Sequence, residues 1–73
     1  MNSERLFNII MMELTTEKMK LEENLEDAIN SKESAEVKVE RVKMALQALT
    51  NKENCIAKFS SLITNNNNNK KEN

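Results

Sequence analysis

The chain has 73 residues, of which 32% are charged, and its formal net charge is only −1. A chain this short forms at most one small domain, and its balanced charge shows no bias toward nucleic acid. It contains no Gly and no Pro, the residues that most readily form tight turns. Glu, Lys, Leu, Met and Ala, all strong helix formers, dominate the body of the chain. The composition therefore predicts an all-α fold and is typical of long helices and coiled coils.

Small domains usually need disulfides, a metal or a partner chain to be stable. Cys55 is the only cysteine and there is no His, so a disulfide within the chain is excluded. A tetrahedral zinc site of Cys and His ligands is not expected either. We predict no metal and no cofactor. Stabilisation by another chain is the remaining route.

The first predicted helical turns carry an apolar cluster at residues 6–14, preceded by Ser3 as a candidate helix cap. The cluster is much shorter than the roughly 20 residues that span a bilayer, and no basic region precedes it as in a signal peptide. It is wider than a two-stranded seam requires. Because Glu4 and Glu13 accompany Arg5 there, packing in a helical bundle is favoured over binding to a membrane surface.

The strongest pattern in the sequence is a column of apolar residues at every seventh position. Its members are Phe7, Leu14, Leu21, Ala28, Ala35, Val42, Leu49, Ile56 and Ile63. On a straight helix such a column drifts by about 20° per heptad. It stays on one face only when the helix supercoils around a partner. The repeat therefore predicts a coiled coil.

A second column accompanies the first and is less regular. When the apolar column is taken as d, the a positions include Lys18, Lys32 and Glu53 beside apolar residues. Near the C-terminus, Phe59 pairs better with the apolar column if that column is taken as a, so the seam shifts between the two halves. The predicted helix-pairing seam consists of Phe7, Met11, Leu14, Leu21, Leu25, Ala28, Ala35, Val39, Val42, Leu46, Leu49, Ile56, Phe59 and Ile63.

Two segments could interrupt the helix. Asn30 with Glu33 is a variant of a capping box, and Thr50 with Glu53 matches the S/T-x-x-E pattern more closely. The heptad register nevertheless passes through both segments without a skip. We therefore predict a single long amphipathic helix over residues 1–63 that forms a coiled coil. The alternative is a helical hairpin that breaks near residues 30–34.

The last ten residues differ from the rest of the chain. Residues 64–73 are rich in Asn and Lys and contain no apolar residue. Ordering such a segment costs conformational entropy without burying apolar surface. We predict a disordered, low-complexity tail over residues 64–73.

No catalytic set of side chains is present. There is no His and no Tyr, and the carboxylates of Glu22, Glu23, Glu26 and Asp27 lie on a predicted solvated face, where no cleft perturbs their pKa values. No basic region precedes the heptads as in a DNA-binding zipper. We predict that the chain is not an enzyme and binds neither a small-molecule substrate nor nucleic acid.

The charges of the two halves are opposite. Residues 1–30 hold seven acids and three bases, a net charge of −4, whereas residues 31–73 hold five acids and eight bases, a net charge of +3. Antiparallel pairing brings Glu17 toward Lys38 and Glu22 toward Lys43, whereas parallel pairing of two copies opposes like charges. Self-association is therefore predicted to be antiparallel.

These observations point to a non-catalytic coiled-coil interaction protein, a small subunit or adaptor of a larger assembly. Its predicted partner is another helical protein chain, either a second copy or a different protein. A lone cysteine fits a reducing compartment, so we expect a cytoplasmic location, with the nucleus as the alternative. Two other functions stay open. One is a peripheral membrane-binding helix, and the other is a regulator that sequesters a larger coiled-coil protein.

Overall fold

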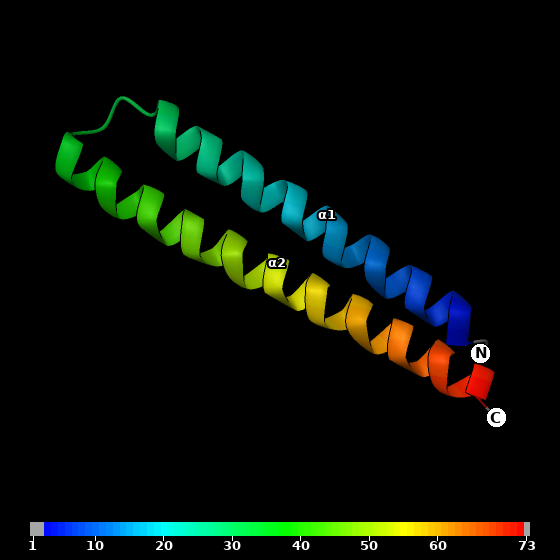
Figure 1. Ribbon diagram of the computed structural model, residues 1–73. Coiled ribbons are helices and arrows are strands. Elements are labelled where there is room, and N and C mark those ends of the chain that lie inside the picture. Colours follow the sequence, from blue (N-terminus) through cyan, green and yellow to red (C-terminus); the bar gives the residue numbers. More distant parts are fainter. Residues whose placement is uncertain (1–2, 73) are drawn as a thin grey trace.

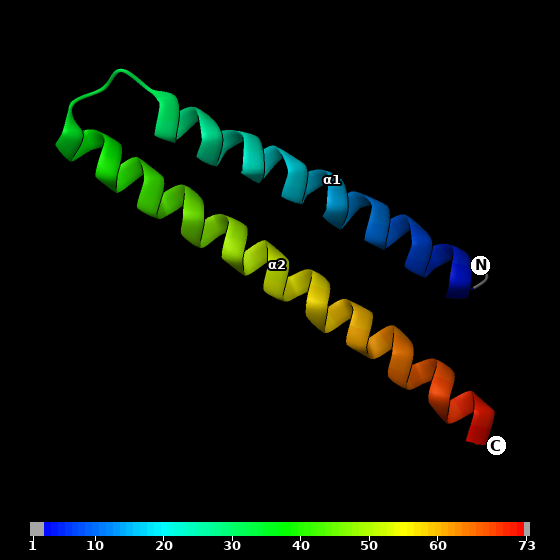
Figure 2. The same cartoon turned by 45° about the horizontal axis from the view of Figure 1, so that its top comes forward.

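The computed structural model describes the backbone of residues 3–72 and the side chains of residues 3–65. Helix α1 spans Ser3–Asn30 and helix α2 spans Ala35–Glu72. The two helices lie side by side and run in opposite directions, as Figures 1 and 2 show. The described part of the chain contains no strand. The all-α fold is confirmed, but the chain forms the hairpin that was the alternative, and the single continuous helix is not what the structure shows.

The residue that follows the end of α1 is a serine and not a glycine. The Ser31 hydroxyl donates a hydrogen bond to the Ala28 carbonyl at 3.0 Å, and the Ser31 N–H approaches the same oxygen at 3.4 Å. The last four carbonyls of a helix have no partner within the helix. Ser31 satisfies one of them, so the chain can leave α1 without a residue of positive φ, and the described backbone has none.

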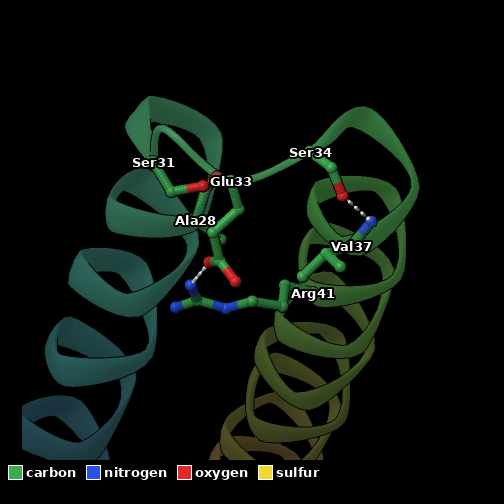
Figure 3. A network of polar contacts seen from close by, with 6 residues as sticks. All are labelled: Ala28, Ser31, Glu33, Ser34, Val37 and Arg41. Atoms are coloured by element: carbon green, nitrogen blue, oxygen red, sulfur yellow. Dashed lines mark hydrogen bonds and ion pairs between the residues drawn. The ribbon is translucent and has the colours of Figure 1, made fainter.

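Helix α2 begins with Ser34 as its N-cap (Figure 3). The Val37 N–H donates to the Ser34 hydroxyl at 3.4 Å, and the Lys38 N–H donates to the Ser34 carbonyl at 2.9 Å. A serine at this position satisfies one of the four free N–H groups of the first turn. The sequence placed the break at the right segment but assigned the capping role to Asn30 and Glu33.

Glu33 has a different role, because its carboxylate accepts a hydrogen bond from the Arg41 guanidinium (Figure 3). This ion pair joins the loop to the second turn of α2. At the second suspected break, Thr50 and Glu53 lie within uninterrupted helix. A capping pattern inside a helix whose flanking turns are already packed does not end it.

Helix α2 continues to Glu72, so the backbone of residues 64–72 is helical where the sequence predicted a disordered tail. A formed helix extends at the cost of fixing one residue for each new hydrogen bond. The disorder of this segment in solution stays a prediction. The side chains from residue 66 onward, and residue 73 as a whole, lie outside the described part.

The hairpin is a thin rod with dimensions of 59 × 19 × 13 Å and a radius of gyration of 17.0 Å. A compact domain of this length has a radius of gyration of about 11 Å. Ala28 and Leu49 are the buried hydrophobic residues among the described side chains, with 2% and 8% of their surfaces exposed. Two helices alone therefore enclose almost no interior.

Candidate helix-pairing surfaces

The sides on which the two helices face each other are marked by side chains that are at least half covered. In α1 these are Phe7, Ile10, Met11, Leu14, Lys18, Leu21, Leu25 and Ala28. In α2 they are Lys38, Val42, Ala45, Leu49, Lys52, Ile56, Phe59 and Ile63. Apart from Ile10, each set consists of two columns with a spacing of seven, which is the arrangement of helices that pack along a shallow left-handed seam.

Eleven of the fourteen predicted seam residues lie on these facing sides. The three others, Ala35, Val39 and Leu46, are exposed. Ala35 is the first residue of α2 and lies beside the loop. Val39 and Leu46 continue the second column of the heptad pattern, which faces the partner helix in α1. In α2 a different column, which contains Lys38 and Ala45, faces the partner helix instead.

Three lysines on the facing sides were missing from the predicted seam: Lys18 in α1, and Lys38 and Lys52 in α2. Each is mostly covered because a lysine stem can lie along apolar surface while its amine stays in water. The spacing of seven that Lys38 and Lys52 share with Ala45 and Phe59 was the signal that could have revealed those two. A search of the sequence for apolar residues alone does not find such lysines.

Phe7 and Phe59 bring the open end of the hairpin together. Their ring centroids are 5.8 Å apart and the ring planes cross at 85°, the edge-to-face arrangement that aromatic pairs favour. One ring belongs to the second turn of α1 and the other to the late turns of α2. This contact fixes which levels of the two helices lie opposite each other.

An ion pair between Lys52 and Glu17 crosses from α2 to α1. The Lys52 amine donates to the Glu17 carboxylate at 2.7 Å. This hydrogen bond and the negative charge of Glu17 raise the pKa of Lys52 above its ordinary value of 10.5, with a further contribution from Cys55, while desolvation works in the opposite direction. Within the chain, Glu17 therefore lies near the middle of α2. The contact of Glu17 with Lys38 that the sequence predicted for two paired copies stays a prediction.

This ion pair also shows which flanks of the two helices share a side. Glu17 lies beside the column of α1 that contains Leu14 and Leu21. Lys52 belongs to the facing column of α2 that also contains Ala45. The opposite side of the rod carries two groups of residues. In α1 they come one or four positions after a member of the column that contains Met11. In α2 they come three positions before a member of the column that contains Val42.

Five of the large hydrophobic residues that are exposed occupy this other side. They are Met12, Met19, Ile29, Val39 and Leu46, and we call them the apolar flank. Of the other exposed hydrophobic residues, Leu6, Leu62, Val37 and Met44 lie on the side of the ion pair, and Ile9 points outward. By the same spacing Glu22, Glu26 and Glu53 also lie on this side. The apolar flank is therefore a set of apolar side chains interleaved with carboxylates, and both helices contribute to it.

Other chemistry is sparse on this rod. Glu22, Glu23, Glu26 and Asp27 are all exposed, and among the described residues no group of three or more His, Cys, Asp or Glu side chains is placed to hold a metal ion. Cys55 is a free, exposed thiol. In the searched part of the chain neither helix is long and apolar enough to cross a membrane.

Comparison of this chain with protein-family models, with curated proteins and with solved structures finds no match. The sequence and the geometry of the hairpin therefore carry the functional argument.

Proposed function

We propose that this protein is a non-catalytic interaction module whose hairpin pairs with helices of another chain, as a small subunit or adaptor of a cytoplasmic or nuclear assembly. The observation that carries the proposal is the combination of a nearly empty interior with an exposed apolar flank. Val39 and Leu46 are 54% and 50% exposed, although both belong to the heptad pattern of the sequence. Heptad residues that the fold leaves uncovered are the expected contacts for further helices.

The shape of the hairpin supports the same conclusion. A rod of 59 × 19 × 13 Å exposes more of its surface than a compact domain of the same mass. Soluble monomers rarely leave large apolar patches in water. Contact with another chain would cover the exposed hydrophobic side chains of the flank.

The proposal is tested by photo-crosslinking in cells. Met19, on the apolar flank, is replaced by a photoreactive phenylalanine. Met44, which lies on the opposite side of the rod and is 70% exposed, receives the same group as the matched control. Irradiation should give specific protein adducts from position 19 and far fewer from position 44. Mass spectrometry then identifies the partner. Equal adducts from both positions, adducts with lipid, or none at all would contradict the proposal.

A further inference from the structure

We infer that the apolar flank binds a basic amphipathic helix of a different protein. The apolar residues of that helix pack on the flank, and its Lys and Arg side chains pair with the carboxylates that lie between the apolar residues of the flank. This inference rests on the proposed function and names the chemistry of the partner. It depends on two features of this side of the rod, the spacing of the exposed apolar side chains and the sign of the charge around them.

The exposed apolar side chains form two pairs along the rod, each with one member in α1 and one in α2. In the register fixed by the contact between the two phenylalanine rings, Met19 lies within about one turn of the level of Leu46, and Ile29 lies close to the level of Val39. The interval from Val39 to Leu46 separates the two pairs by about 10 Å along the rod. An amphipathic helix with apolar residues at i and i+7 presents its anchors at the same interval.

The carboxylates of the flank lie between and beside these pairs. Glu22 and Glu26 fall between the two pairs, and Glu53 falls beyond Leu46 toward the open end of the hairpin. All three are exposed, and none of them forms an ion pair among residues 3–65. Covering a carboxylate without a partner is costly, whereas a Lys or Arg of the incoming helix satisfies it. The flank is therefore complementary to a cationic helix and repels an acidic one.

The two sides of the rod differ in charge. Outside the facing columns, the side of the flank, out to the α2 residues one position after the Val42 column, holds four acids and two bases, a net charge of −2: Glu22, Glu26, Glu36, Glu53, Arg5 and Lys43. The side of the ion pair holds three acids and three bases, a net charge of zero: Glu13, Glu17, Asp27, Lys20, Arg41 and Lys58. A cationic helix is therefore attracted to the flank in preference to the opposite side.

The surface next to Val39 shows what kind of side chain fits there. A shallow hollow is lined by Ala35, Glu36, Val39 and Glu40. Lys43 pairs with the carboxylate of Glu40 at 3.6 Å, which leaves the charge of Glu36 uncompensated among residues 3–65. A Lys or Arg of the partner can lay its methylene stem on Val39 and bring its charge to Glu36.

Binding of two designed peptides to the full chain tests the chemistry of the partner. The probe is a fluorescent amphipathic peptide of about three heptads, with leucine on its apolar face and lysine elsewhere, and its counterpart carries glutamate in place of lysine. Fluorescence anisotropy should show that the lysine peptide binds at least about tenfold more tightly than the glutamate peptide. Added salt should weaken the binding of the lysine peptide. Equal affinity for both peptides would overturn the inference.

Charge reversal tests whether the peptide binds on the flank. Glu22→Lys combined with Glu26→Lys should weaken the lysine peptide at least about tenfold and strengthen the glutamate peptide, because attraction becomes repulsion. Glu13→Lys combined with Asp27→Lys makes the same change of net charge on the opposite side and should alter either affinity by less than about twofold. Circular dichroism checks that both double variants keep their helices. Equal losses in the two double variants would show that the peptide senses only the overall charge, which would overturn the inference.

The photoreactive group at position 19 identifies the natural occupant in cells. Its adduct should map to a segment of a different protein that has apolar residues at i and i+7 and more Lys and Arg than Asp and Glu. Glu22→Lys with Glu26→Lys should remove this adduct, whereas Glu13→Lys with Asp27→Lys should retain it. An adduct with an acidic segment, with a second copy of this chain or with lipid would overturn the inference.

The outcomes separate this inference from the proposed function. If position 19 captures an acidic helix or a second copy of this chain, pairing with another chain stands and only the basic partner is wrong. If position 19 captures nothing in cells, the proposed function fails and the inference fails with it.

Discussion

Ser31 and Ser34 do at the loop what Gly and Pro do in most turns. The hydroxyl of Ser31 donates to a carbonyl at the end of α1, and the hydroxyl of Ser34 accepts from an N–H at the start of α2. Serine side chains compete with the helix for backbone partners, which weakens a helix interior and favours its ends. Two hydroxyls three residues apart are thus enough to turn a chain that has no Gly and no Pro.

Removal of the N-cap should destabilise the hairpin. Ser34→Ala should lower the free energy of unfolding by about 1 kcal/mol, because the Val37 N–H loses its acceptor. Ser34→Asp, which keeps a side-chain oxygen at the cap, should restore most of the loss. Urea denaturation followed by circular dichroism measures both. An alanine variant as stable as the parent chain would show that the cap contributes nothing.

The ion pair between Lys52 and Glu17 should make stability depend on alkaline pH. The pKa of Lys52 is higher in the folded chain than its ordinary value of 10.5. The stabilisation is therefore fully present below pH 10.5 and is lost as the pH rises through the higher folded value. Because both side chains are partly exposed, the effect is small and weakens with salt.

The corresponding measurement is an NMR titration of the Lys52 amine. Glu17→Gln should return its pKa toward 10.5 and remove the part of the alkaline destabilisation that belongs to this pair. Glu13→Gln, on the same helix but outside the pair, serves as the control. An unchanged Lys52 pKa in Glu17→Gln would mean that the contact is absent in solution.

At the scale of the helices, Leu49 accounts for much of the buried apolar surface between α1 and α2. It is 8% exposed, whereas Leu62 on the same helix is 53% exposed. Leu49→Ala should cost about 2 kcal/mol or more, since it removes buried methyl groups and leaves a cavity. Leu62→Ala should change the stability by no more than about 0.5 kcal/mol. Thermal unfolding of both variants compares them, and equal losses would be incompatible with the observed packing.

The same columns explain why the sequence predicted the helices but not their break. From Ala28, the last inward residue of α1, to Val42, the first apolar inward residue of α2, is two heptads. The loop therefore leaves the apolar column in register. Only the companion column changes, from the one that holds Met11 and Leu25 to the one that holds Ala45 and Phe59. That change was visible as a shift of the seam, and a turn between two helices is its physical cause.

The side chains that form a surface between the helices were predictable only in part. Apolar periodicity identifies the inward columns because burial of apolar groups drives helix pairing. It does not identify which residues stay uncovered after the chain folds back on itself. Val39 and Leu46 continue the heptad pattern, yet only the register fixed by Phe7 and Phe59 shows that they lie outside the intrachain contact.

At the scale of the whole molecule, the hairpin and a continuous helix differ most in the distance between the chain's two halves. In the Cys55→Ser background, dyes on Arg5→Cys and Ser61→Cys report this distance, because both positions are exposed. A continuous helix would separate the two positions by about 84 Å, more than the 59 Å length of the rod. In the hairpin they lie on adjacent helices whose axes are about 10 Å apart.

Energy transfer within single doubly labelled chains, diluted with unlabelled protein, should therefore be high. It should fall to the baseline in strong denaturant. Low transfer under native conditions, together with full helicity, would show that the chain is extended and that the hairpin is wrong.

The beginning of α1 and the end of α2 lie at the same end of the rod, and the loop lies at the other (Figure 1). A polypeptide that enters and leaves at one pole can be grafted into a surface loop of a host protein without either end crossing the host. The host would then display the four-residue loop at the tip of a stalk up to 59 Å long. An epitope or a fluorophore placed at Lys32 would stand clear of the host surface, and the length of the stalk could be adjusted by whole heptads.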